Sequence, residues 1–307
     1  MLNPLVSILI PTYNDNPEFL KLALNSIIEQ TYKPTEIIIV DDSTSLETIE
    51  IIDEFVQQNP RITVIRNPNK KKGLSAALNE GIRHCNGDYI ARMDADDLSL
   101  PNRIELEMAA FEENVAVVGG QGIIIDKEGE YIRKFDELPL THKGLVNNLK
   151  RAQPSFIHPS VIIRKRTLLE CGGYDENFQC AEDMNLWIRL SHIHPVKNIK
   201  DVVIMYRKYG GNASTVMSER QNRAVAANQL LSVIGCERPL SDRQFDKVMQ
   251  IVTKNQLCRL YYFTMEKTSF FIKRVFSHLK VYYLLSNLVW LFFAMSRSKL
   301  KKVVFNS

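Results

Sequence analysis

The sequence predicts an α/β protein built on a mostly parallel sheet that is flanked by helices. Two observations indicate this class. Short apolar runs alternate with segments whose apolar residues recur at helical spacing, and polar clusters directly follow several of those runs. Such alternation is typical of strand–helix–strand units, whose strands run parallel. With 307 residues, 45% of them hydrophobic, the chain is long enough for one large α/β domain and a smaller region.

Three strand–helix units open the chain. Strands are predicted over residues 6–10, 36–40 and 62–65, and helices over residues 17–29 and 45–58. Pro11 stops the first strand at a loop, and Pro17 lies in the first turn of its helix, where a missing N–H costs little. Ser45 is a residue type that favours the N-cap of the second helix.

The alternation continues with a helix opened by Gly73 and a strand over residues 88–93. Three lysines at 70–72 precede Gly73 and suit either an anion at the helix N-terminus or a solvated loop. Further helices are predicted over 101–113 and 182–191, further strands over 115–119, 160–164 and 202–206, and an antiparallel excursion over 122–125 and 131–135. From about residue 220 the pattern is helical, so we expect a domain over residues 1–218 and a helical region over 219–307.

The strand at 88–93 ends abruptly in three carboxylates, those of Asp94, Asp96 and Asp97. Like charges gathered at a strand end are unfavourable unless a cation or solvent offsets them. This stretch therefore indicates either a divalent-metal site or a solvated acidic turn. It is not an EF-hand, because Leu98 occupies a ligand position and the required glycine is missing.

Two more polar clusters, residues 11–14 and 41–45, follow strands of the same predicted sheet. Since the carboxyl ends of parallel strands meet at one rim, these clusters should lie beside the three aspartates. Tyr13 offers an aromatic face for a nucleobase, and Asp41 or Asp42 offers an acceptor for its ring N–H. A metal held by Asp94 and Asp96 would then meet the phosphates.

The order of short motifs along the chain resembles that of the inverting family 2 glycosyltransferases of the GT-A fold. The motifs are PTYN at 11–14, VDDSTS at 40–45, GLSAALNEG at 73–81, DADD at 94–97, GGYDE at 172–176 and AED at 181–183. The resemblance covers residues 4–214 and is of the kind found in bacterial polysaccharide, O-antigen and capsule assembly. It implies a nucleotide-sugar donor whose nucleoside contacts Pro11, Thr12, Tyr13 and Asp41.

By the same resemblance, Asp94-Ala95-Asp96 is the DxD motif that binds Mn²⁺ or Mg²⁺ and the donor diphosphate, and Asp183 is the catalytic base. A helix N-terminus favours an ionised Asp183, which keeps it ready as a base but lowers its basicity; a purely structural capping role is the alternative. His158 and Glu182 are expected on the acceptor side. Arg92 either pairs with an aspartate of its own loop or reaches phosphate.

One position departs from the resembling family. Many members carry a histidine that completes the metal site shortly after a late Tyr-Arg pair, and here Tyr209 stands in its place. The ion would then be held by Asp96, by Asp94, and by phosphates and water. We therefore expect weaker metal affinity.

The C-terminal segment differs in charge from the body. After Glu266 the chain has eight basic residues and no acidic one, around an apolar run at 281–295. This run is shorter than the roughly 20 residues that span a membrane, and its flanking cations suit an interfacial helix. A helix packed on the domain or on a partner subunit, as in a homo-oligomer, is the alternative. We expect contact with the inner face of the membrane rather than with nucleic acid.

The sequence thus predicts a metal-dependent transfer of a hexose, from a UDP-linked donor, to a lipid-linked saccharide in cell-surface polysaccharide synthesis. Five cysteines without a C-x-x-C pair, and an N-terminus without a signal-peptide pattern, predict a cytoplasmic protein peripheral to the membrane. A nucleotidyltransferase is the rival enzyme, but residues 11–14 lack its glycine-rich basic loop. A non-catalytic scaffold is less consistent with Asp183 beside Asp94 and Asp96.

Overall fold

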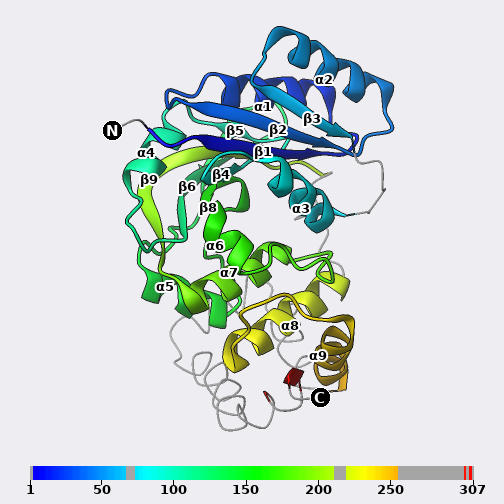
Figure 1. Ribbon diagram of the computed structural model, residues 1–307, viewed down its shortest axis with the longest axis vertical. Helices are drawn as coiled ribbons and strands as arrows, with labels where there is room; N and C mark the ends of the chain where they lie inside the picture. The colour runs from blue at the N-terminus through cyan, green and yellow to red at the C-terminus, as the bar shows by residue number, and fades with distance from the viewer. Residues whose placement is uncertain (1–2, 67–72, 211–218, 255–300, 302–303, 306–307) are drawn as a thin grey trace.

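The computed structural model describes residues 3–66, 73–210, 219–254, 301 and 304–305 (Figure 1). Its strands are β1 Val6–Thr12, β2 Thr35–Asp41, β3 Ile62–Arg66, β4 Tyr89–Arg92, β5 Leu98–Ser99, β6 Val117–Ile125, β7 Tyr131–Lys134, β8 Val161–Arg164 and β9 Val196–Arg207. Its helices are α1 Pro17–Ile28, α2 Leu46–Gln58, α3 Leu74–His84, α4 Arg103–Ala109, α5 His142–Lys150, α6 Lys165–Glu170, α7 Glu182–Ile193, α8 Glu219–Ile234 and α9 Asp242–Lys254, with a 3₁₀ turn at His158–Ser160.

The described strands form one sheet in the order β3-β2-β1-β4-β8-β6-β9-β5, with β7 paired to β6. The first four strands run parallel, β8 runs against them, and β6 and β9 return to the first direction. The predicted α/β class with a mostly parallel sheet is therefore confirmed. The predicted antiparallel excursion is the β6–β7 pair, in which Ile123 lies opposite Lys134.

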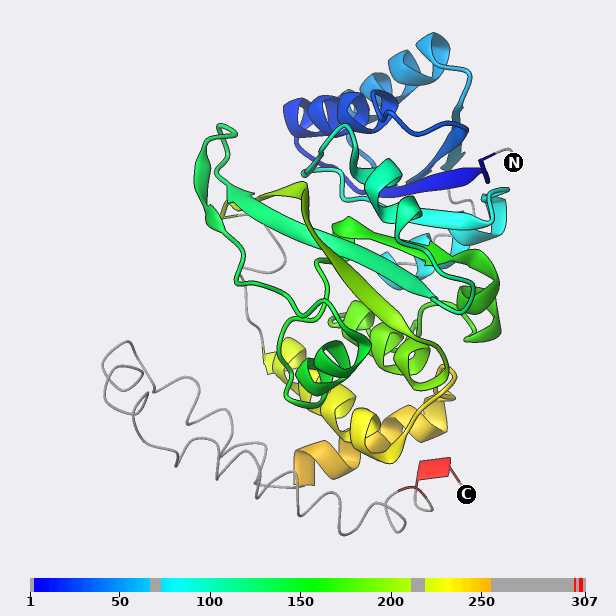
Figure 2. The same cartoon turned by 90° about the vertical axis from the view of Figure 1, so that its left-hand side faces the viewer.

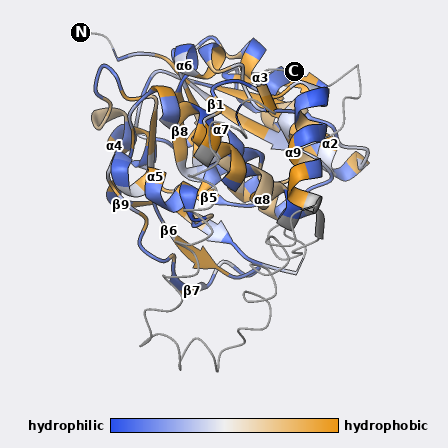
Figure 3. Ribbon diagram, turned by 90° about the horizontal axis from the view of Figure 1, so that it is seen from below, coloured by the Kyte–Doolittle hydropathy of each residue, from blue (hydrophilic) through white to orange (hydrophobic). Residues whose placement is uncertain are grey.

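Helices cover both faces of the sheet (Figure 1). On β1, Ile8 and Ile10 pack in one core with residues of α1 and α2, whereas Leu9 packs on the other face with α3 and α7. This alternation follows from the two-residue period of side chains along a strand. Figure 3 shows the same pattern, with hydrophobic residues towards the centre and hydrophilic residues on the outer helices such as α4 and α5.

Three sequence predictions of element boundaries were wrong. The strands predicted at 115–119 and 122–125 are one strand, β6, and the late strand β9 begins at Val196 rather than at residue 202. The long pair β6 and β9 runs through the molecule side by side (Figure 2). Gly120 lies between the two predicted strands and allows close packing there, because a Cβ on Gly120 would lie 2.3 Å from Cγ2 of Val203.

The third wrong boundary is that of the helix predicted over 101–113, which is α4, Arg103–Ala109. Its last turn tightens, since the N–H of Ala110 bonds to the carbonyl of Glu107 at 3.1 Å. Helices α5 and α6 and the short strand β5 were not predicted.

The C-terminal helices α8 and α9 pack together and against the loop before α7. Leu231 of α8 and Val248 of α9 share a buried cluster with Phe178. Of the helical region predicted over 219–307, the structure describes residues 219–254, 301 and 304–305; the boundary at residue 218 and the lysines at 70–72 lie outside the described residues. The apolar run at 281–295 also lies outside them. None of the helices within the described ranges is long and apolar enough to cross a membrane.

Candidate active site

The ends of β1 and β2 form the first part of the site. Thr12 and Asp41 are neighbours in the parallel register, and the Thr12 hydroxyl donates to Oδ1 of Asp41 at 3.2 Å. Both are buried, and the N–H of Ser43 also donates to Oδ1 of Asp41, at 3.0 Å. Pro11 lies within β1, which continues to Thr12 instead of stopping at the proline. The structure thus brings the predicted nucleoside residues of both strands together.

Tyr13 projects from this rim because the next residue anchors the loop. Asn14 adopts the left-handed conformation with φ 53°, and its Oδ1 accepts the N–H groups of Thr44 and Ser45, both at 2.8 Å. Ser45 occupies the predicted N-cap position of α2, but its hydroxyl makes no capping bond. The Tyr13 side chain is left 66% exposed, which makes its ring available for stacking.

The three aspartates after β4 gather as predicted. Asp94, Asp96 and Asp97 each place a carboxylate oxygen within 4.8 Å of the others. Asp97 is fully buried; its Oδ1 accepts the N–H of Arg207 at 2.7 Å, and its Oδ2 has no hydrogen-bond partner in the described part of the chain. Ala95, between Asp94 and Asp96 in the chain, is also buried.

The charges in this cluster are unbalanced. Burial, the Asp94 charge and the Asp15 charge raise the pKa of Asp96 to about 7, while a hydrogen bond from Tyr209 opposes the rise. Asp15 was not among the residues singled out from the sequence, although it directly follows the PTYN motif. Burial raises its pKa to about 6, with added repulsion from Asp94. Asp15 is therefore a fourth carboxylate at this rim.

The cluster fits a divalent cation on its own geometry. Like-charged carboxylates and an orphaned buried oxygen on Asp97 are features that a cation would relieve. Carboxylate oxygens suit Mn²⁺ and Mg²⁺. Tyr209 stands where many members of the resembling family carry a metal-binding histidine. Its hydroxyl contacts Asp96, so this difference from the family lies at the aspartate cluster itself.

The start of α7 forms the opposite side of the site. Ala181, just before Glu182 and Asp183, adopts a left-handed conformation with φ 53°. Its carbonyl accepts the side-chain amide of Asn228 from α8 at 2.8 Å, which helps to hold this strained position. Strain of this kind in a non-glycine residue often accompanies a functional site.

Burial dominates the electrostatics of the acidic pair. It raises the pKa of Glu182 to about 7, with repulsion from Asp183 as the second cause. Burial also raises the pKa of Asp183, although the backbone N–H of Met184 lowers it. The helix N-terminus alone predicted a lowered basicity for Asp183, and this prediction is wrong. Desolvation of the charged carboxylate raises its pKa by more than the backbone N–H groups lower it.

His158 lies beside this pair, on the side assigned to the acceptor. Its Nε2 is 2.8 Å from the hydroxyl of Tyr174, and its Nδ1 is 3.9 Å from Oε1 of Glu182. Burial, and then the charge of Arg92, hold the pKa of His158 well below its ordinary value. The imidazole is thus neutral, and it links Tyr174 to Glu182. Tyr174 is a further site residue that was named only as part of the GGYDE motif.

Arg92 connects the two sides. Its Nη1 lies 2.5 Å from Oδ2 of Asp94, so of the two roles left open the pairing with its own loop is the one present. The charge of Arg92 also opposes the raised pKa values of Glu182 and Asp183. Conversely, the charge of Asp94 raises both of those pKa values further. The aspartate cluster and the start of α7 are therefore within electrostatic reach of each other.

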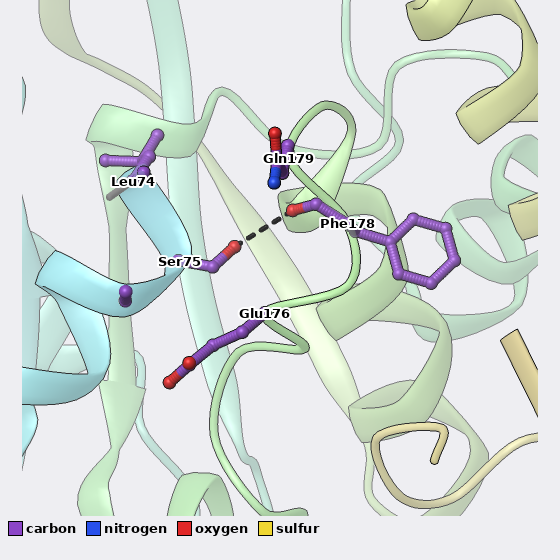
Figure 4. A pocket seen from close by; sticks show the side chains of 7 residues that line it. Leu74, Ser75, Glu176, Phe178 and Gln179 are labelled. Carbon is purple, nitrogen blue, oxygen red and sulfur yellow. Dashed lines mark hydrogen bonds between the residues drawn. The ribbon is translucent and has the colours of Figure 1, made fainter. Parts of the chain in front are cut away.

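Hydrogen bonds join the GLSAALNEG motif at 73–81 to the GGYDE motif at 172–176 and the residues after it, at the edge of the site. Asn79 in α3 exchanges hydrogen bonds with the backbone of Tyr174, accepting its N–H at 2.8 Å and donating to its carbonyl at 2.9 Å. Nearby, the Ser75 hydroxyl donates to the carbonyl of Phe178 at 3.1 Å (Figure 4). A pocket of about 190 Å³ lies here, lined by Gly73, Leu74, Ser75, Ala76, Glu176, Phe178 and Gln179.

The fold is the GT-A fold. The structure is similar to that of Staphylococcus aureus TarS 1–349 in complex with UDP-GlcNAc, with a TM-score of 0.63 at 18% identity. The superposition covers 86% of this chain and 76% of that chain. It is also similar to the structure of the mannosyltransferase PcManGT from Pyrobaculum calidifontis in complex with GDP-Man and Mn²⁺, with a TM-score of 0.57 at 15% identity. That superposition covers 100% of this chain and 88% of that chain. At these identities the likeness shows the fold alone.

The family follows from the sequence comparison. The profile of Glycosyl transferase family 2 matches residues 7–173. The chain is 32% identical over 204 residues to the amylovoran biosynthesis glycosyltransferase AmsE of Erwinia amylovora, covering 66% of this chain and 75% of that protein. It is 29% identical over 206 residues to the O-antigen biosynthesis glycosyltransferase WbnJ of Escherichia coli, covering 66% and 78%. The chain belongs to glycosyl transferase family 2 and is a glycosyltransferase.

Proposed function

We propose that this glycosyltransferase moves a hexose from a UDP-linked donor, with inversion and with the help of a divalent metal, to a hydroxyl of a saccharide acceptor. One observation carries the proposal: Asp94, in the aspartate cluster that follows β4, pairs with Arg92 and is within electrostatic reach of Glu182 and Asp183 at the start of α7, so a donor and a base can meet there. The proposed catalytic unit is residues 1–218, with 219–307 as an accessory region.

The nucleoside end of the donor fits the rim of β1 and β2. There the exposed Tyr13 ring would stack on the base, and the buried Asp41 would orient the groups around it. Asp94 and Asp96 would hold Mn²⁺ or Mg²⁺, which when bound supplies positive charge to the departing diphosphate. Similar structures in complex with UDP, UDP-GlcNAc and GDP-Man support a nucleotide-sugar donor.

Asp183 would remove the proton from the acceptor hydroxyl while that oxygen attacks C1 of the sugar. The C1–O bond to the diphosphate breaks on the opposite face, and a single displacement inverts the configuration. Because the pKa of Asp183 is raised towards neutral pH, its carboxylate is a stronger base than that of an exposed aspartate. Glu182 and His158 would position the acceptor next to this carboxylate.

A panel of nucleotide sugars tests the reaction. With Mn²⁺ and a disaccharide acceptor, we expect the purified protein to release UDP from a UDP-hexose at least tenfold faster than it releases nucleotide from GDP- or CMP-sugars. Product stereochemistry, read by the anomeric proton in NMR, should be inverted. Pyrophosphate release from a nucleoside triphosphate and a sugar phosphate would instead identify a nucleotidyltransferase. Binding of UDP-sugars without any turnover would identify a scaffold.

The acceptor is proposed to be lipid-linked, in cell-surface polysaccharide synthesis at the inner face of the membrane. The names of AmsE and WbnJ, and the eight basic residues after Glu266, support this. Basic residues near anionic lipid contribute about 1 kcal/mol each.

Truncation after Glu266 is therefore expected to move the protein from pelleted anionic vesicles to the supernatant. A variant of the whole chain with Lys299→Gln, Lys301→Gln and Lys302→Gln separates charge from apolar contact, since it should bind less tightly and lose less affinity than the wild type when salt is added. Unchanged sedimentation of the truncated chain would rule out membrane contact through this segment.

A further inference from the structure

Arg92 is a buried cation between two groups of carboxylates. It is the last residue of β4, only 2% of it is exposed, and Arg103 holds its backbone carbonyl by a hydrogen bond of 2.8 Å. Its Nη1 forms an ion pair with Oδ2 of Asp94 at 2.5 Å, while Nε and Nη1 have no partner with hydrogen-bond geometry in the described part of the chain. A buried guanidinium with an unmet donor is costly, which points to a role beyond packing.

The charge around Arg92 is unevenly distributed. On one side lie Asp94 and the rest of the aspartate cluster, and on the other Glu182 and Asp183 at the start of α7 are within electrostatic reach. One guanidinium cannot fully balance both groups. Which group it serves depends on what else binds Asp94, because a divalent ion there would take over the charge of that carboxylate.

We propose that Arg92 is a positioning residue that stands in for the metal beside Asp94 in the free protein, and that turns its charge to Glu182 and Asp183 once a divalent ion occupies the aspartate cluster. The inference rests on the proposed function. In this arrangement, binding of the metal and donor on one side leaves the charge of Arg92 to keep the carboxylate of Asp183 ionised, and so able to accept a proton, on the other. The unpaired Nε gives the side chain a donor that is still available for that second partner.

The inference makes a prediction that a purely structural role does not. If Arg92 competes with the metal for Asp94, removing its charge should strengthen binding of Mn²⁺ alone while it weakens catalysis. Two charges at a separation of a few ångströms in a partly solvated site predict a tightening on the order of tenfold. If Arg92 only holds Asp94 in place, its loss should weaken Mn²⁺ binding and catalysis together.

The test uses a matched pair of variants in the full-length protein. Arg92→Gln removes the charge but keeps hydrogen-bond donors, and Arg92→Lys keeps the charge. Free Mn²⁺ is measured by electron paramagnetic resonance without nucleotide, and kcat and KM are measured with a UDP-hexose. For Arg92→Gln we expect about tenfold tighter Mn²⁺ binding and about 100-fold lower kcat at an unchanged donor KM. Arg92→Lys should keep Mn²⁺ affinity near that of the wild type and recover part of kcat.

Arg164→Gln is the structural control. Arg164 lies on β8 beside β4, and its side chain bonds to the hydroxyl of Tyr89 at 2.9 Å and to the carbonyl of Glu112 at 2.9 Å. Its loss should lower the melting temperature without changing Mn²⁺ affinity.

Equal or weaker Mn²⁺ binding by Arg92→Gln overturns the inference and leaves the proposed function standing. If the wild type and Asp96→Asn bind Mn²⁺ equally poorly, the metal of the proposed function fails, and the inference fails with it. A melting curve of each variant confirms that it is folded, and Arg92→Lys remains informative if the glutamine variant is not.

Discussion

Replacing Asp183 by asparagine is expected to lower kcat for glycosyl transfer by about 10³-fold, because the acceptor hydroxyl then loses the group that takes its proton. The amide is nearly the same size, so the start of α7 and its backbone hydrogen bonds should persist. The KM for the donor should change little, since Asp183 acts on the acceptor side. Single-turnover transfer and UDP binding by calorimetry, measured on the same preparation, separate these effects.

Glu182→Gln is the matched control for this prediction. It removes the neighbouring carboxylate, which lies 3.9 Å from His158, and should cost only about tenfold through poorer positioning of the acceptor. It should also lower the pKa of Asp183, since repulsion between the two carboxylates is relieved. If Glu182→Gln is the more damaging variant, the roles of the two residues must be exchanged.

Replacing Asp96 by asparagine is expected to abolish metal-dependent activity, with a loss of about 100-fold or more that added Mn²⁺ does not restore. Asp96 is the carboxylate whose pKa is raised to about 7 by burial and by Asp94. Because a ligand must be deprotonated, Mn²⁺ affinity of the wild type should fall as pH decreases below about 7 and level off above it. Calorimetric titration of Mn²⁺ between pH 5.5 and 8 measures both.

Tyr209→His is the variant expected to act in the opposite direction. Tyr209 already contacts Asp96, so an imidazole there could become a metal ligand and tighten Mn²⁺ binding about tenfold. Asp97→Asn tests whether the orphaned Oδ2 matters to the ion or only to the loop. Unaltered Mn²⁺ affinity in both Asp96→Asn and Tyr209→His would place the metal elsewhere.

Much of the fold could be read from local patterns. Short apolar runs identified β1, β2 and β3, and helical spacing of apolar residues identified α1 and α2. The prediction divided β6 into two strands on either side of Gly120, because the packing of Gly120 against Val203 exists only in the folded chain. A contact with a strand about eighty residues later leaves no mark on the local sequence.

The site divides in the same way. By itself the sequence determined which carboxylates follow strands, and hence that Asp94, Asp96 and Asp97 meet near Thr12 and Asp41, because parallel strands end at one rim. Tertiary structure alone decided that Asp15 joins them and that Arg92 lies between both acidic groups. It also decided that burial raises the pKa of Asp183 despite its helix terminus. Charge balance and desolvation depend on all the groups that surround a side chain in space, and the order of residues along the chain does not show which groups those are.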